Sequence, residues 1–170
     1  MGWIARQLRT VGLTFGLLAV LAGCAACQAQ NKPAVPDGVA LTVLVRNTMA
    51  ALNDANITGN YTVFRDLGSP EFGEENTSAR LAGIFAPLRA RKLDLGPIIL
   101  FTPKLTKEAA IDDESVLRLT GFFPTEPLRV NFALGYQNID GAWRLFDISI
   151  STTQARAPSG GKGNRAPPTN

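Results

Sequence analysis

The chain has 170 residues with two cysteines and no histidine, and its formal charge of +3 comes from its ends, because residues 37–152 hold 11 basic and 14 acidic side chains. The lack of histidine excludes Ser-His-Asp triads, Cys-His dyads and the usual zinc hydrolase sites, so any acid-base catalysis would depend on carboxylates, tyrosine or lysine. The acidic balance of the central part argues against a nucleic-acid-binding surface.

The first predicted element is an export signal at the start of the chain. Arg6 and Arg9 precede an apolar, uncharged segment of 12 residues from Val11 to Ala22. This is the length of a signal-peptide core and is shorter than the ~20 residues needed to span a bilayer. Residues Leu21-Ala22-Gly23-Cys24 close the segment and resemble the lipobox of bacterial lipoproteins. The resemblance implies that residues 1–23 are removed and that the Cys24 sulfur carries diacylglycerol as a membrane anchor.

An ordinary secretory signal cut near Ala26 or Ala29 is the alternative, and either version exports the chain. Ala25 follows the cysteine in place of the aspartate that resembles an inner-membrane retention signal. For a Gram-negative source, this favours a location in the cell envelope, on the periplasmic side of the outer membrane.

Cys24 and Cys27 have the Cys-x-x-Cys spacing of half-zinc and thioredoxin-like sites. A zinc site needs two further ligands and a thioredoxin site needs a βαβ setting, and this chain offers no other cysteine and no histidine. We therefore expect no metal and no cofactor. Cys27 is either a second acylation site or a residue without a role of its own.

Two segments of biased composition flank the predicted domain. Residues 24–36 are punctuated by proline and are typical of a tether that lifts a domain off a membrane. Residues 153–170 contain no aromatic residue and no valine, isoleucine or leucine, which predicts a disordered tail. Residues 37–152 are long enough for one domain with one hydrophobic core.

The domain begins with a predicted amphipathic helix. Asp37 is a good N-cap, and the apolar residues after it recur at spacings of three and four until about Asn56. The apolar residues of this helix are Leu41, Leu44, Val45, Met49 and Leu52.

Two shorter helices are expected next. The first covers residues 60–67, with Thr58 as its cap, and the Gly68-Ser69-Pro70 sequence ends it. After an acidic loop around Glu74 and Glu75, Asn76 or Thr77 caps the other helix, which kinks or ends at Pro87. The apolar residues of these two helices are Tyr61, Phe64, Leu67, Leu81, Ile84, Phe85 and Leu88.

Beyond Gly96 the pattern becomes extended. Short runs of β-branched and aromatic residues predict strands over residues 98–102 and 115–123, and residues 104–111 extend the first of them. From Leu128 to Gln137 apolar and polar residues alternate, which indicates a half-buried strand. A turn over residues 138–141 leads into a last strand over residues 142–151.

The apolar residues of the last strand change phase. Trp143 and Leu145 share one face, whereas Phe146, Ile148 and Ile150 share the other. A bulge near Leu145 would bring both sets inward. The alternative is a strand that is covered on both faces.

Helices followed by an antiparallel meander predict an α+β domain, with the N-terminal helices packed on one concave face of a curved sheet. This order, together with the turn Asp140-Gly141-Ala142-Trp143-Arg144-Leu145, resembles the NTF2-like, or cystatin-like, cone over residues 39–151. The resemblance implies a pocket inside the cone. Members of that superfamily include both enzymes and binding or assembly modules, so the fold leaves the function open.

Aromatic side chains are the candidates for the lining of this pocket. A cone lined by such residues would bind a small apolar ligand such as an acyl chain, with the polar ends of tyrosine and tryptophan at its mouth. The simpler interpretation is that they fill the core. The candidate pocket residues are Tyr61, Phe64, Phe132, Tyr136 and Trp143.

Three functional hypotheses follow. The first is a non-catalytic envelope lipoprotein, anchored in the membrane, that binds a small apolar ligand or an envelope protein. The second is an isomerase or hydratase that uses an Asp/Tyr pair, drawn from Asp54, Asp66 or Asp147 and from the two tyrosines. The third is a structural accessory subunit that docks or forms a homodimer through the exposed sheet face. Residues 112–114 are acidic, but they lack the alternation of an EF-hand and are expected to form a solvated loop.

Overall fold

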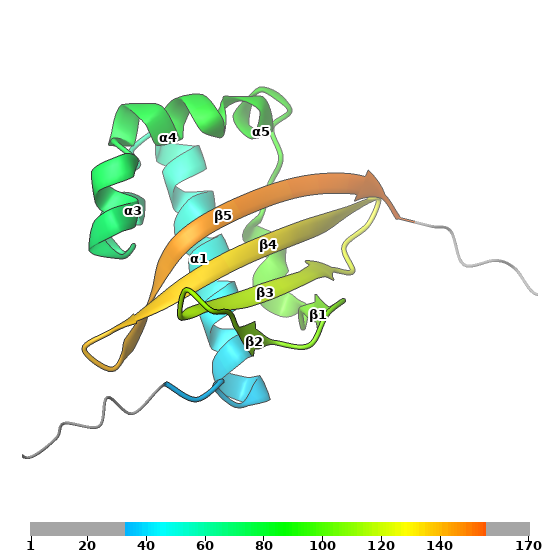
Figure 1. The fold of residues 1–170 in the computed structure, drawn as a ribbon. Helices are drawn as coiled ribbons and strands as arrows, with labels where there is room; N and C mark the ends of the chain where they lie inside the picture. The colour runs from blue at the N-terminus through cyan, green and yellow to red at the C-terminus, as the bar shows by residue number, and fades with distance from the viewer. Residues whose placement is uncertain (1–32, 156–170) are drawn as a thin grey trace, which may run out of the picture. The chain divides into compact units, whose positions relative to one another are not determined.

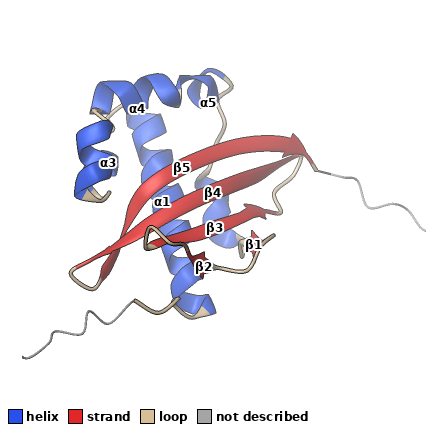
Figure 2. Ribbon diagram, viewed as in Figure 1, coloured by secondary structure: helices blue, strands red, loops and turns tan. Residues whose placement is uncertain are grey.

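The computed structural model describes residues 33–155, which fold as helices followed by an antiparallel sheet (Figures 1 and 2). The predicted signal peptide, Cys24, Cys27, most of the tether and the tail beyond residue 155 lie outside the described residues. Between residues 33 and 155, no helix combines the length and the apolar character needed to cross a membrane.

The predicted first helix is α1, which covers Gly38–Thr58. The Asp37 carboxylate accepts a hydrogen bond from the Ala40 amide at 2.8 Å, so the predicted N-cap is confirmed. Gly59 ends the helix with a φ of 71°, a left-handed conformation that glycine adopts without steric cost. The remaining helices are α2 (Thr62–Asp66), α3 (Pro70–Glu75), α4 (Ser78–Ile84), α5 (Ala86–Ala90) and the 3-10 helix η1 (Gly96–Leu100).

Two details of the short helices differ from the prediction. Thr58 does not cap α2, which begins only at Thr62. The expected acidic loop is helical, because the Ser69 hydroxyl accepts a hydrogen bond from the Phe72 amide and Pro70 lies in the first turn of α3, where its missing N–H costs nothing. Thr77 caps α4, as predicted.

The strands are β1 (Lys104–Leu105), β2 (Ala110–Ile111), β3 (Val116–Phe123), β4 (Leu128–Ile139) and β5 (Ala142–Gln154). The pairings between these strands are antiparallel, β3-β4-β5 is a meander, and both β1 and β2 pair with β3. The predicted strand over residues 98–102 is wrong, because Pro97 starts η1 there. The β5 strand also extends to Gln154, two residues into the predicted tail.

The predicted bulge in the last strand is confirmed. Tyr136 pairs with Leu145 and Gly135 with Asp147, which leaves Phe146 as the extra residue of β5. Ile148 and Ile150 pack against the core after this shift, whereas Phe146 contacts the Arg118 guanidinium instead. The bulge therefore brings the isoleucines inward but not Phe146.

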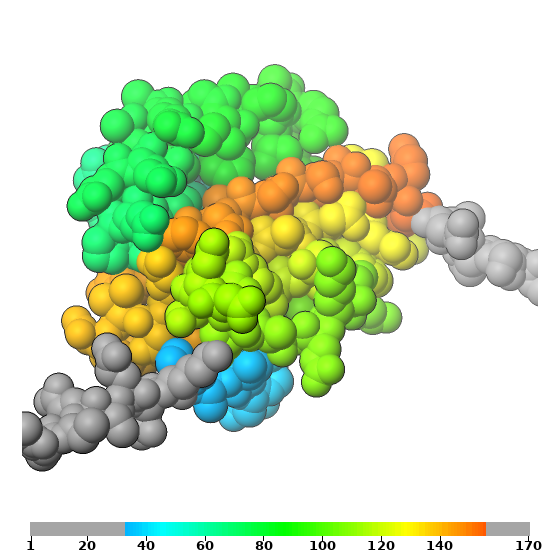
Figure 3. Space-filling view, in the orientation of Figure 1, coloured from blue at the N-terminus to red at the C-terminus, as the bar shows by residue number. Residues whose placement is uncertain are grey.

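The core lies between α1 and the inner face of the sheet (Figure 1). The sheet is not strongly curled, so the fold class is α+β without the closed cone that the resemblance implies. Among residues 33–155, no helix covers β3, β4 and β5 on the face shown in Figure 3, which is the outer face of the sheet. Helices α2 to α5 lie at the C-terminal end of α1 (Figure 1), where α3 contacts β5.

Candidate functional site

The candidate pocket residues are packing residues of the core. Tyr61, Phe64, Phe132 and Tyr136 are each at most 2% exposed, and Trp143 is half-buried against the same core. Phe64 meets Phe72 and Phe85 edge-on, and Phe132 packs on Phe123 with 5.6 Å between ring centroids. The hollows described below are lined by other side chains.

Both tyrosine hydroxyls are held by neutral or cationic groups. The Tyr61 hydroxyl donates to Asn56 Oδ1 and accepts from Arg89, each at 2.5 Å. The Tyr136 hydroxyl lies 2.8 Å from the Thr48 hydroxyl and 3.3 Å from the Leu44 carbonyl oxygen. Burial raises the pKa of Tyr136 well above its usual value, so this phenol stays protonated at neutral pH.

The candidate carboxylates lie elsewhere. Asp54 is exposed on α1, and Asp66 forms an ion pair with Arg65 at 2.7 Å. Asp147 pairs with Arg118 on the outer face of the sheet. Within residues 33–155 no hydrogen bond joins either phenol to a carboxylate, so the structure does not assemble the Asp/Tyr pair of the enzyme hypothesis.

Arg118 is the centre of a charged cluster on the outer face. Its Nε donates to Asp112 Oδ2 at 2.7 Å, and its terminal nitrogens face Asp147 and, at 3.7 Å, Glu114. The hydrogen bond from Arg118, followed by that from the Val116 amide, holds the pKa of Asp112 below its usual value.

The acidic residues 112–114, which were predicted to form a solvated loop, lie in this cluster and precede β3. The amides of Glu114 and Val116 donate to Asp112 Oδ1, while Asp113 and Glu114 are exposed. Asp112 therefore fixes the turn. In the described part of the chain, no group of three or more acidic or sulfur side chains is placed to hold a metal ion.

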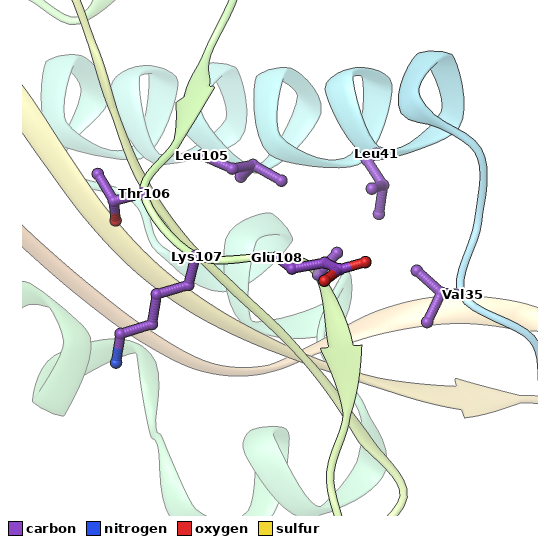
Figure 4. Close-up of a pocket in the computed structure, with 7 residues that line it drawn as sticks. Val35, Leu41, Leu105, Thr106, Lys107 and Glu108 are labelled. Carbon is purple, nitrogen blue, oxygen red and sulfur yellow. The ribbon is translucent and has the colours of Figure 1, made fainter.

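A shallow groove lies at the N-terminal end of α1, between the segment that enters this helix and the β1–β2 connection (Figure 4). We call it the N-terminal groove. It has a volume of about 490 Å³, and its lining residues are Val35, Leu41, Leu105, Thr106, Lys107, Glu108 and Ala109. In Figure 4 the Glu108 carboxylate points toward the space between Leu41 and Val35, whereas the Lys107 ammonium points away.

The N-terminal groove was not predicted from the sequence. Residues 104–111 were expected to be one extension of a strand, and the structure divides them into β1, a four-residue connection and β2. The polar sequence Thr106-Lys107-Glu108 between two short apolar runs was the available signal for that break. The β1–β2 connection lies against Val35 and Leu41, which are about 70 residues earlier in the chain. A local sequence pattern does not predict a contact over that separation.

A second hollow lies between η1 and the β3–β4 connection, and we call it the η1 hollow. Its volume is about 300 Å³, and it is more enclosed than the N-terminal groove. Leu93, Phe101, Pro127 and Leu128 give it an apolar lining, and Glu126 lies among them. This volume is at the lower end of the range of small-molecule sites.

A third hollow, of about 360 Å³, lies between the start of α3 and the β4–β5 hairpin, and its lining includes the charged side chains of Arg65, Asp66 and Arg144. Ion pairing between Arg65 and Asp66 already satisfies two of these side chains.

Comparison of the chain with protein-family models, curated proteins and solved structures finds no match.

Proposed function

We propose that this protein is a lipid-anchored lipoprotein of the bacterial cell envelope whose NTF2-like α+β domain is a non-catalytic binding module. The Leu21-Ala22-Gly23-Cys24 sequence at the end of an apolar segment is the observation that carries the proposal. The order of helices before an antiparallel meander supports the NTF2-like assignment of the domain.

The arrangement of the tyrosines favours binding over the isomerase or hydratase alternative. A phenol that stabilises a developing enolate must face the substrate with a carboxylate base nearby. Here the Tyr136 hydroxyl is occupied by Thr48 and Leu44, and the Tyr61 hydroxyl by Asn56 and Arg89.

The outer sheet face gives little support to an accessory subunit or homodimer that docks through it. Residues of β4 that alternate with the core residues are Arg129, Asn131, Ala133, Gly135 and Gln137. Obligate interfaces are more apolar than this set. The η1 hollow is the better candidate for a small apolar ligand, because its lining is mainly apolar and partly enclosed.

The anchor is tested by Cys24→Ala in the full chain. The variant should keep its fold but leave the membrane fraction or accumulate as an unprocessed precursor, because the acyl chains supply the stable attachment. Cys27→Ala is the matched control and should stay in the membrane. Mass spectrometry of the wild-type N-terminus should find diacylglycerol on Cys24, and separation of the two membranes should place the protein in the outer one. Unchanged membrane retention of Cys24→Ala would contradict the proposal.

The binding function is tested by native mass spectrometry of protein extracted from membranes. We expect a retained apolar ligand or a protein partner. If the ligand lies in the η1 hollow, Phe101→Ala should lower the retained fraction, whereas the exposed neighbour Ile99→Ala should not. Detection of isomerase or hydratase turnover that Tyr136→Phe abolishes would instead favour the enzyme.

A further inference from the structure

Four apolar side chains stand exposed around the N-terminal end of α1. The exposed fractions are 42% for Val35, 75% for Val39, 49% for Val43 and 39% for Leu105. Val39 and Val43 are one helical turn apart and share a face of α1. Val35 and Leu105 line the N-terminal groove together with Leu41, which lies about 200° around the helix from both valines, so the four residues surround this end of α1. We call these four residues the N-terminal rim.

Three residues of the N-terminal rim, Val35, Val39 and Val43, lie close to the predicted anchor along the chain. Val35 follows Cys24 by eleven residues. Even a fully extended segment of this length reaches at most about 40 Å. A lipid on Cys24 therefore keeps Val35 within about 40 Å of the membrane, so the rim can reach the lipid surface, although the tether alone does not set its orientation.

The charges beside the rim balance. Lys104 and Lys107 lie within two residues of Leu105 along the chain, and the carboxylates of Asp37 and Glu108 offset their charge. A surface without net charge gains little from anionic lipid headgroups, so an attraction between this end and a bilayer would come from apolar burial. Tethering raises the effective concentration of the surface, so that even a weak contact is populated.

We propose that the N-terminal rim inserts its valine and leucine side chains into the headgroup layer of the membrane, so that the domain stands with the N-terminal end of α1 on the lipid surface. This proposal rests on the proposed lipid anchor and adds an orientation to it. The opposite end of α1, with the short helices, then points away from the membrane.

The proposal has an internal control on the same helix. Ile57 is 73% exposed, nearly as much as Val39. It lies 18 residues further along α1, or about 27 Å at the rise of an α-helix, and on the same helical face. A helix lying flat on the membrane would bury both side chains, whereas a helix standing on its N-terminal end would bury only Val39.

The experiment uses the full-length lipidated protein with Cys27→Ser. Val39→Cys or Ile57→Cys carries an environment-sensitive fluorophore, and the protein is reconstituted into vesicles of phosphatidylethanolamine and phosphatidylglycerol. Flotation reports anchoring, and nitroxide-labelled lipids and aqueous iodide report the surroundings of the label. We expect lipid quenching at position 39, iodide quenching at position 57, and no change in either at high salt.

The outcomes separate the two proposals. Protein that does not float with the vesicles overturns the lipid anchor. Protein that floats but shows iodide quenching at position 39, or equal lipid quenching at both positions, leaves the anchor intact and overturns the orientation. A position 39 that is shielded from both quenchers is covered by protein and also overturns it. Loss of the lipid quenching at high salt overturns the apolar contact.

A second pair of variants tests the side chains themselves. Val35→Asp with Val43→Asp, added to the protein labelled at position 39, should remove most of the lipid quenching while flotation continues. Val63→Asp with Leu67→Asp changes two exposed apolar residues, one in the first turn of α2 and one just beyond its end, and should leave the quenching unchanged. Unchanged quenching in the first pair would overturn the proposal.

Discussion

The two faces of the sheet are built from alternate residues of the same strands, but the inner face is packed with apolar side chains, whereas the outer face carries ion pairs. On the inner face, Leu119 pairs with Leu134 and Gly121 with Phe132, all of them buried. On the outer face, Arg118 joins Asp112 and Asp147 in half-exposed ion pairs. Exposed ion pairs contribute little because water screens them, whereas removal of buried apolar area is costly. The stability of the domain should therefore depend on the inner face.

The largest expected effect is that of Phe132→Ala on the inner face. Phe132 is 2% exposed, and truncation of a buried phenylalanine should lower the free energy of unfolding by about 3–5 kcal/mol. Asn131→Ala is the control on the outer face of the same strand, where the side chain donates to the Thr153 hydroxyl at 3.2 Å. The control should cost less than about 1 kcal/mol. Urea denaturation measures both, and similar losses would contradict the division between the faces.

Substitution of glycine by alanine tests how tightly each face is packed, because it adds a Cβ atom instead of removing side-chain atoms. A Cβ at Gly121 would overlap the Lys104 carbonyl oxygen of β1 and lie 2.8 Å from the Phe132 ring. A Cβ at Gly135 would meet the Asp147 carboxylate at 2.5 Å and the Arg118 guanidinium at 2.9 Å, which are ends of flexible side chains. Gly121→Ala should therefore cost about 1–3 kcal/mol, and Gly135→Ala clearly less.

Thermal unfolding of the two glycine variants gives the order of the costs. Asp147→Ala should remove most of the penalty of Gly135→Ala, because it removes the nearest obstacle. If Gly135→Ala proves the costlier change, the outer face is the more tightly packed of the two, and the comparison fails.

Tyr136 is a buried side chain with a polar end on the inner face. Tyr136→Phe leaves the Thr48 hydroxyl without its partner and should cost about 1 kcal/mol at neutral pH. Because the folded-state pKa is raised, the unfolded chain ionises first, near the ordinary phenol pKa of about 10. Stability should fall as pH rises above that value, and less steeply in the variant. Equal slopes in urea denaturation between pH 8 and 11 would contradict this assignment.

Periodic and capping signals predicted most of the fold. Asp37 gave the start of α1, the alternation in β4 gave its inner face, and the phase change after Leu145 gave the bulge. The apolar run Ile98-Ile99-Leu100 fits a strand equally well by composition, and only the local effect of Pro97 decides for η1.

The sites were less predictable than the fold. The partner of Tyr136 is Thr48, 88 residues away, so the sequence named the tyrosine but not the group that occupies its hydroxyl. Phe146 was assigned inward because its phase matches Ile148, but the bulge falls on Phe146 itself and turns it toward Arg118. The alternation of residues along a strand is visible in its own sequence. The residue that a bulge leaves unpaired depends on the pairing with the neighbouring strand, which that sequence does not show.

The smallest expected effect is that of Asp112→Asn on the outer face. The pKa of this carboxyl is lowered in the folded state, mainly by the Arg118 hydrogen bond, so its contribution is present above the unfolded value of 3.8 and is lost as pH falls through the folded one. The variant should be slightly less stable than wild type at pH 7, and this difference should shrink below pH 3.8 and at high salt. Asp113→Asn, at the exposed neighbour, should show no such pattern in urea denaturation. A difference that persists at low pH would mean that the charge of Asp112 is not what stabilises the outer face, because asparagine keeps the Oδ1 acceptor that the Glu114 and Val116 amides use.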